Sequence, residues 1–164
     1  MPTQPLLDLS TLDLSRTIFQ REDMQRILRQ RGRFSLVDGI LHLDPKTSDF
    51  VVGYLDVRAD GWWAEDHIPG RQLFPGVLMV EASAQLGSFD FFQRHPEISA
   101  TFIAFTGTDS TRFRATVEPP CRLLLVGKVN RFRVHGGKVM FTYEFQGLVE
   151  GKVVFETEVS GMQL

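Results

Sequence analysis

Residues 77–92 constrain the fold more than any other part of this chain. They read VLMVEASAQLGSFDFF, which places apolar residues on every side of a helix with 3.6 residues per turn. A helix of this kind is expected to be surrounded by protein rather than to lie on the surface with one wet face. It has the length of an ordinary globular helix and is too short to cross a bilayer. The rest of the chain must therefore supply its cover.

A β pattern in the second half of the chain can supply that cover. Between residues 138 and 145, and again between 153 and 159, apolar and polar residues alternate, and Gly136-Gly137 and Glu150-Gly151 mark the hairpin turns. We further expect a helix at 21–31 and strands at 34–43, 49–57, 101–105 and 111–115. Strands with one apolar face need a partner layer. The expected fold is α+β, an antiparallel sheet wrapped around the central helix.

Length and composition limit the class of protein. The chain has 164 residues, enough for one domain, so we expect an arm at 1–20 and a single domain at 21–164. A net charge of −2 argues against nucleic acid as the main partner. A single cysteine, Cys121, excludes an internal disulfide. No secretory signal, membrane span or metal-ligand spacing is visible, so a cytoplasmic protein without a metal site is expected.

The central helix carries one narrow polar stripe. Glu81, Gln85 and Ser88 lie at positions i, i+4 and i+7, which share one face of a helix. A carboxylate in apolar surroundings is costly to ionise, and Glu81 is therefore a candidate acid. The alternative is a purely structural carboxylate that Gln85 and the backbone satisfy.

A Pro/Gly-rich loop with a histidine precedes the helix. Pro75 and Gly76 start the helix and leave its first N–H groups free, and these groups together with the helix dipole favour negative charge. A thioester oxygen that gains charge could be held there by Gly76 or Val77. His67 is suited to act as a base near neutral pH. Each feature alone has an ordinary structural explanation, but the conjunction indicates proton transfer beside a carbonyl.

The segment from His67 to Gln85 resembles the 3-hydroxyacyl-[acyl-carrier-protein] dehydratases of type II fatty-acid synthesis. Their signature reads His-Phe-Pro-Gly, then Pro-Gly-Val-Leu, then Glu-Ala-x-Ala-Gln. Eleven positions match at the same spacing: His67, Pro69, Gly70, Pro75, Gly76, Val77, Leu78, Glu81, Ala82, Ala84 and Gln85. The resemblance extends more weakly from about residue 25 to the C-terminus.

This resemblance implies a hot-dog fold and the loss of water from a 3-hydroxyacyl thioester to give the trans-2-enoyl thioester. Carried over by position, His67 removes the C2 proton and Glu81 protonates the departing hydroxyl. The N–H of Gly76, with Val77 as the lesser candidate, polarises the carbonyl, while Pro75 and Gln85 support the site. Histidine and carboxylate come from different subunits in the family, so a homodimer is the expected catalytic unit and a trimer of dimers stays open.

Several positions depart from the family pattern. Asp66 and Ile68 flank the histidine where the family usually has Gly and Phe, and Trp62-Trp63 replaces a region normally rich in Phe. The family's Leu-Pro-His-Arg reads Leu28-Arg29-Gln30-Arg31, so its second histidine is absent. The related dehydratase–isomerase branch has Asp at the position of Glu81. These departures concern the range of substrates more than the chemistry.

The implied partner is an acyl carrier protein, which presents the substrate on phosphopantetheine. Arg112, Arg114, Arg131 and Arg133 are candidates for a landing patch, although a solvated face is the plainer reading. The reaction needs no redox or metal cofactor. Three alternatives stay open: a hot-dog thioester hydrolase, a coenzyme A-linked hydratase or dehydratase, and a non-catalytic acyl-binding subunit.

Overall fold

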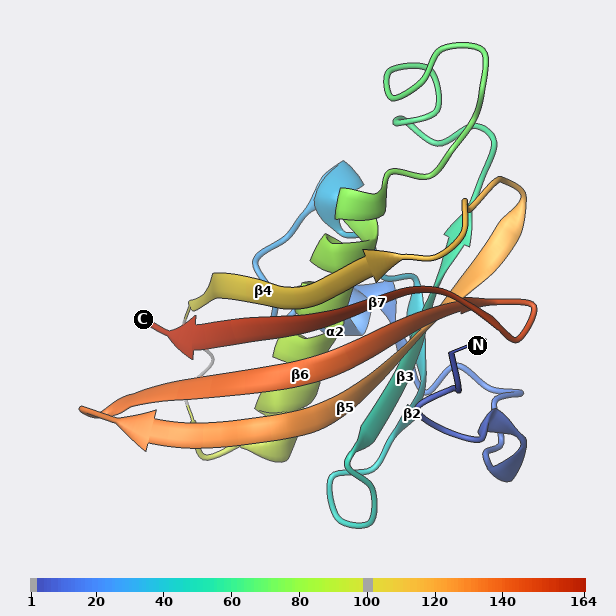
Figure 1. The fold of residues 1–164 in the computed structure, drawn as a ribbon. Coiled ribbons are helices and arrows are strands. Elements are labelled where there is room, and N and C mark those ends of the chain that lie inside the picture. Colours follow the sequence, from blue (N-terminus) through green and yellow to red (C-terminus); the bar gives the residue numbers. More distant parts are fainter. Residues whose placement is uncertain (1–2, 99–101) are drawn as a thin grey trace.

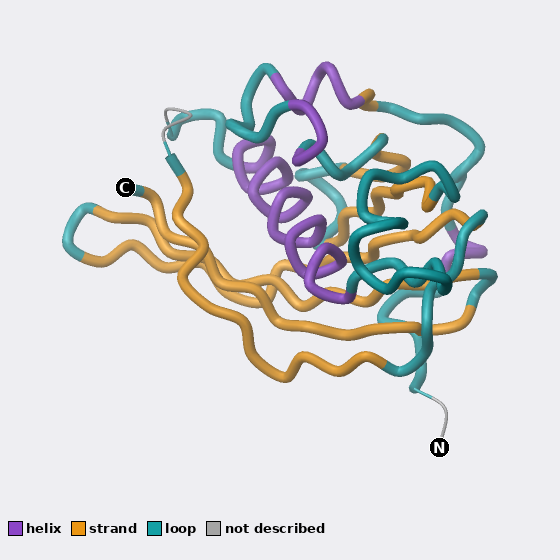
Figure 2. The backbone as a smooth tube through the Cα atoms, turned by 90° about the horizontal axis from the view of Figure 1, so that it is seen from above, coloured by secondary structure: helices purple, strands orange, loops and turns teal. Residues whose placement is uncertain are grey.

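The computed structural model describes residues 3–98 and 102–164 (Figure 1). The long helix α2 lies against the concave side of a curved sheet, and the segments before β2 lie around them (Figures 1 and 2). In chain order the elements are η1 (Leu9–Thr11), β1 (Phe19–Gln20), α1 (Arg21–Gln25), η2 (Gly32–Phe34), β2 (Gly39–Leu43), β3 (Phe50–Val57), α2 (Gly76–Arg94), β4 (Ile103–Phe113), β5 (Cys121–His135), β6 (Lys138–Val149) and β7 (Lys152–Gln163).

The strands form one antiparallel sheet in the order β1-β2-β3-β5-β6-β7-β4. The long meander β5-β6-β7 follows the expected alternation, and its turn residues Gly136, Gly137, Glu150 and Gly151 all have positive φ. β4 pairs with β7 and stands at the edge of the sheet. The α+β, sheet-around-helix architecture expected from the apolar pattern is confirmed.

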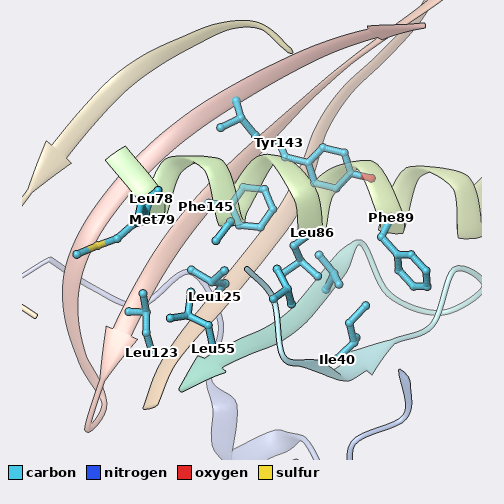
Figure 3. Packing of buried hydrophobic residues seen from close by; sticks show 14 of the residues in the cluster. Ile40, Leu55, Leu78, Met79, Leu86, Phe89, Leu123, Leu125, Tyr143 and Phe145 are labelled. Atoms are coloured by element: carbon cyan, nitrogen blue, oxygen red, sulfur yellow. The ribbon is translucent and has the colours of Figure 1, made fainter. Parts of the chain in front are cut away.

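The main core fills the space between α2 and the sheet. Ala82 and Leu86 on α2 and Leu123, Leu125 and Phe145 on the sheet are fully buried (Figure 3). Gly127 makes this packing possible, because a Cβ there would lie 2.3 Å from the ring of Phe145. Burial of large apolar side chains on both layers is the main force that holds the helix on the sheet.

A second apolar cluster lies on the outer face of the sheet. There the N-terminal segment packs on Val52, Val126 and Leu148 with Leu6, Leu7, Leu9, Leu12 and Leu14. The side chain of Gln146 fastens this segment, since its Oε1 accepts from the Leu6 N–H at 2.7 Å and its Nε2 donates to the Gln4 carbonyl at 3.1 Å. Residues 1 and 2 of the expected arm lie outside the described residues, and its last two residues form β1.

Four expected elements differ from the structure. The strand expected at 34–43 is confined to Gly39–Leu43, because the Phe34 carbonyl accepts from Gln85 Nε2 and the Leu36 N–H donates to Gln85 Oε1. The helix expected at 21–31 ends at Gln25. The strands expected at 101–105 and 111–115 are one strand, Ile103–Phe113, interrupted by bulges; residue 101 lies outside the described residues.

The surroundings of α2 also differ from the expectation of complete cover. Val77 is 72% exposed, and the side chains of Val80, Glu81, Ala84 and Ser88 are only partly buried. These positions form one stripe along the helix, since they recur at intervals of three and four residues. The single chain therefore leaves part of the apolar surface of α2 uncovered.

Candidate active site

The loop between β3 and α2 presents His67 to solvent and extends beyond the helix N-terminus (Figure 1). The His67 backbone N–H donates to the Trp63 carbonyl at 2.9 Å, and the His67 Nδ1 lies 2.9 Å from the Leu73 carbonyl oxygen. Because a carbonyl oxygen only accepts, this contact assigns the proton of the neutral ring to Nδ1. Nε2 is then the unprotonated nitrogen, which is the form a base requires.

The N-terminus of α2 offers free backbone donors. Pro75 is the N-cap residue, with φ −61° and ψ 125°, and it is buried. Among residues 3–98 and 102–164, nothing accepts a hydrogen bond from the N–H of Gly76 or Val77. Such groups and the helix dipole stabilise a negative oxygen. The ring of Phe113 on β4 lies so close to Gly76 that a Cβ there would come within 2.7 Å of it.

Glu81 is held by Gln85 in the arrangement that the polar stripe suggests. Gln85 Nε2 donates to Glu81 Oε1 at 2.8 Å and to the Phe34 carbonyl at 2.8 Å, while its Oε1 accepts from the Leu36 N–H at 3.0 Å. Gln85 is only 3% exposed, so these three bonds fix its side chain. In the part of the chain that the structure describes, the second carboxylate oxygen of Glu81 has no hydrogen-bond partner.

A groove runs beside Glu81 along the partly covered stripe of α2. Its walls come from the helix and from the sheet edge, and its lining includes Ala84, Ser88, Ile103, Phe105 and Gly161. The Glu81 carboxyl therefore lies at a small groove of mixed polarity, on the same helix as the free N-terminal N–H groups. A carboxyl group and a free amide donor site are groups that can act on an acyl thioester.

His67 and Glu81 do not meet within one chain. No hydrogen bond or ion pair joins them in the part of the chain that the structure describes, and His67 does not line the groove beside Glu81. The structure thus places Gly76, Val77, Glu81 and Gln85 on α2, with Pro75 as its N-cap residue, and leaves the histidine on a separate, projecting loop.

The four candidate arginines fall into two pairs. Arg112 and Arg114 flank Phe113 close to the start of α2, and Arg114 forms an ion pair with Glu156. Arg131 and Arg133 line a different groove at the far part of β5, together with Asp109 and Glu158. The strand register separates the pairs. Followed across β7 and β6, Arg112 on β4 lies level with Val126 on β5, which is five positions before Arg131. They do not form one basic patch.

A buried charged cluster supports the other end of α2, and sequence reasoning missed it. Asp90 is fully buried and accepts from Tyr143 Oη at 2.7 Å and from Arg94 Nε at 2.6 Å. Burial raises the pKa of the Asp90 carboxyl, and burial beside Asp90 raises the pKa of Tyr143 well above its usual value. The i, i+4 spacing of Asp90 and Arg94 was the sequence signal that could have predicted this ion pair. The contact of Phe113 with Gly76 left no such signal, because the two residues are far apart in the sequence.

Within residues 3–98 and 102–164, no three His, Cys, Asp or Glu side chains gather in a group that could hold a metal ion. No helix in the same ranges combines the length and apolarity of a membrane span.

Comparison with protein families gives a match over most of the chain. Residues 28–158 match a FabA-like domain. The 3-hydroxyacyl-[acyl-carrier-protein] dehydratase FabZ of Campylobacter jejuni is 32% identical over 142 residues, which cover 85% of this chain and 93% of that protein. The protein of the same name from Herpetosiphon aurantiacus is 36% identical over 135 residues, covering 82% and 91%.

Solved structures agree on the hot-dog fold. The dehydratase heterocomplex ApeI:P from Xenorhabdus doucetiae superimposes with a TM-score of 0.68 at 14% identity, covering 86% of this chain and 90% of that one. A variant of the phenylacetic acid degradation protein PaaI from Thermus thermophilus gives a TM-score of 0.56 at 17% identity, covering 76% and 91%. At these identities the likeness concerns the fold alone.

Proposed function

The chain belongs to the FabA-like family, and we propose that it removes water from a 3-hydroxyacyl thioester on an acyl carrier protein to give the trans-2-enoyl thioester. It is a dehydratase, a lyase of fatty-acid synthesis, as its relatives over most of its length are. The observation that carries the catalytic assignment is the Glu81 carboxyl, held by Gln85 at a small groove on the same helix as the free Gly76 N–H.

The proposed chemistry follows from these groups. His67 Nε2 takes the C2 proton, and the electrons of that C–H bond move to the thioester oxygen. The N–H of Gly76, with Val77 as the lesser donor, stabilises the oxyanion. The charge then returns to form the C2–C3 double bond, the C3–O bond breaks, and Glu81 donates its proton to the leaving hydroxyl, which departs as water.

The separation of the two side chains supports a site shared between two protomers. β4 is an edge strand, and Phe102, Phe105 and Phe113 on or beside it are each about half exposed. An open edge with large apolar side chains is a surface that proteins normally cover. A second copy placed against β4 covers this edge and the open stripe of α2, and it brings a His67 loop to each Glu81. We therefore propose a homodimer as the catalytic unit, with a trimer of dimers as a further assembly.

The substrate arrives on phosphopantetheine, and the proposed reaction uses no metal or redox cofactor. Among the four candidate arginines, the position of Arg112 and Arg114 near the start of α2 favours these two as the carrier contact. A carrier protein that docks there delivers the thioester close to Gly76. Arg131 and Arg133 remain the weaker candidates, because they lie farther along the sheet.

An assay with trans-2-enoyl and 3-hydroxyacyl thioesters, on carrier protein and on coenzyme A, tests the reaction. The enoyl absorbance and free thiol are followed separately. We expect reversible hydration without thiol release, a preference for the carrier-bound form, and a loss of at least ~100-fold in H67A. Thiol release identifies a hydrolase, and a preference for coenzyme A overturns the carrier assignment. Tight acyl binding without turnover indicates a non-catalytic subunit.

Complementation between two inactive variants tests the shared site. H67A and E81Q are unfolded together, mixed in equal amounts and refolded. If the site spans two protomers, the mixture regains about a quarter of the wild-type rate, because half the molecules are heterodimers with one intact site of two. A mixture that stays as inactive as its components, while each variant is folded and dimeric, contradicts the shared site.

A further inference from the structure

A cavity of about 740 Å³ is formed by the segment around η2, the end of β3 and the loop that follows β3. Its lining includes Leu36, Trp62, Trp63 and Phe74. None of the residues to which the proposed function assigns a chemical role belongs to this lining. The volume is in the range of small-molecule sites in proteins, about 300–1,000 Å³. The chain therefore has room for a ligand outside the reaction site.

The aromatic part of the lining consists of the only two tryptophans in the chain. Trp62 is 41% exposed, and in the described ranges it has no hydrogen bond or ring contact. Trp63 is only 5% exposed and packs edge-to-face on Phe74, with the ring centroids 5.2 Å apart. A Cβ at Gly61 would lie 2.5 Å from Trp63 Nε1, so glycine is needed there to seat this indole. Trp62 is thus a free surface on which a planar ring can stack.

The indole N–H of Trp63 is a donor without a partner. In residues 3–98 and 102–164, nothing accepts a hydrogen bond from it, yet Nε1 is not among the unpaired polar atoms that are sealed from solvent. The N–H group therefore reaches open space, and Trp63 lines this cavity. Donors on buried side chains are normally paired with protein, water or ligand. An acceptor atom in the cavity would satisfy this one.

The charges of the lining indicate the sign of the ligand. Three carboxylates line the cavity and each pairs with an arginine: Asp38 with Arg21, Asp56 with Arg122, and Asp60 with Arg58. The lining also contains Arg33, whose guanidinium has no partner in the part of the chain that the structure describes. One positive charge therefore remains unbalanced. A guanidinium presents a fork of N–H donors that matches a carboxylate.

We propose that this cavity binds a small aromatic carboxylate, with its ring against the indole of Trp62 and its carboxylate at Arg33. The Trp63 N–H is the donor for a further oxygen of the ligand or for a water molecule that accompanies it. This site is separate from the proposed reaction, because the two share no residue. It also gives a role to Trp62-Trp63, where the chain departs from the family pattern.

Calorimetry with three matched probes tests the chemistry of the site in the full-length protein. The probe 2-naphthoate is planar and charged, 2-naphthamide is planar and neutral, and decahydronaphthalene-2-carboxylate is charged but not planar. We expect naphthoate to bind about 10-fold more tightly than the amide and about 3-fold more tightly than the saturated acid. R33Q and W62A should each weaken naphthoate binding about 10-fold, while W62F retains most of it. R16Q, an exposed arginine outside the lining, is the matched control.

The two tryptophans also give a direct readout of where the probe binds. Isotope-labelled protein shows two indole N–H signals in a nitrogen–proton correlation spectrum, and W62F assigns them. Naphthoate should shift the Trp63 signal in the wild type and equally in the inactive H67A, so the site stands even if the dehydratase assignment fails. Absence of binding, equal affinity for the amide, or wild-type affinity in both R33Q and W62A overturns the proposal. An affinity that falls in E81Q but not in R33Q places naphthoate in the reaction site and overturns it as well.

Discussion

Replacing Gln85 by leucine tests whether the polar stripe of α2 is a working part of the site. The substitution keeps a similar volume and removes three hydrogen bonds, to the Leu36 N–H, the Phe34 carbonyl and Glu81 Oε1. An unsatisfied buried polar group costs about 1–3 kcal/mol. Because Phe34 and Leu36 lie in a segment that water can partly reach, we expect a loss of about 2–4 kcal/mol in the free energy of unfolding.

The same substitution should affect catalysis separately from stability. A protein with about 5–15 kcal/mol of stability remains folded after this loss, so the rate can be measured. Without the Gln85 donor, Glu81 is no longer oriented, and we expect kcat to fall at least ~10-fold with a smaller change in KM. Urea unfolding and the hydration assay give the two quantities, with S83A on the same helix as the control.

Two results would contradict this account of Gln85. If Q85L keeps the wild-type kcat and loses less than about 1 kcal/mol, the three bonds are neither structural nor functional supports. If Q85L loses stability but keeps its kcat, Gln85 is a structural residue alone. In that case Glu81 does not depend on Gln85 for its orientation.

Three further predictions concern the two ends of α2. Y143F removes a donor to the buried Asp90 carboxyl and should lower the free energy of unfolding by about 1.5–3 kcal/mol in urea unfolding. Burial raises the pKa of Asp90, so the folded chain holds this proton more tightly than the unfolded chain. The stability that this proton contributes is complete below the unfolded pKa of about 3.8 and is lost as the pH rises through the raised pKa of the folded chain. The free energy of unfolding of D90N should therefore change less with pH over this range. Urea titrations at several pH values measure it. G76A should lower kcat/KM at least ~10-fold in the hydration assay, because its methyl group displaces the Phe113 ring at the oxyanion donors; an unchanged kcat/KM would move the oxyanion site elsewhere.

Much of the fold could be predicted from local patterns. The helix at Gly76–Arg94 and the meander β5-β6-β7 follow from periodicities of 3.6 and 2 that are written in consecutive residues. β4 was expected as two strands, and the elements that were predicted least well are the short ones before β2. There the backbone of residues 34–36 bonds a side chain about 50 positions away, which no local pattern records.

The candidate site divides in the same way. Glu81 and Gln85 share a helix, so their spacing alone predicts the contact that the structure contains. The contact of Phe113 with Gly76 depends on how β4 is placed against α2. The position of Gln30 at the groove beside Glu81 depends on how the N-terminal segment is placed against the same helix. Likewise, four arginines that share a strand pattern in the sequence separate into two pairs once strand register is set.

By itself, the order of residues determined a helix too apolar for a surface, a sheet to cover it, and the donors at its N-terminus, because these depend on near neighbours in the chain. Tertiary structure alone decided that one stripe of this helix stays open and that His67 stands apart from Glu81. These outcomes depend on the packing of segments remote in sequence, and remote contacts follow from the summed burial of the whole domain rather than from any short pattern.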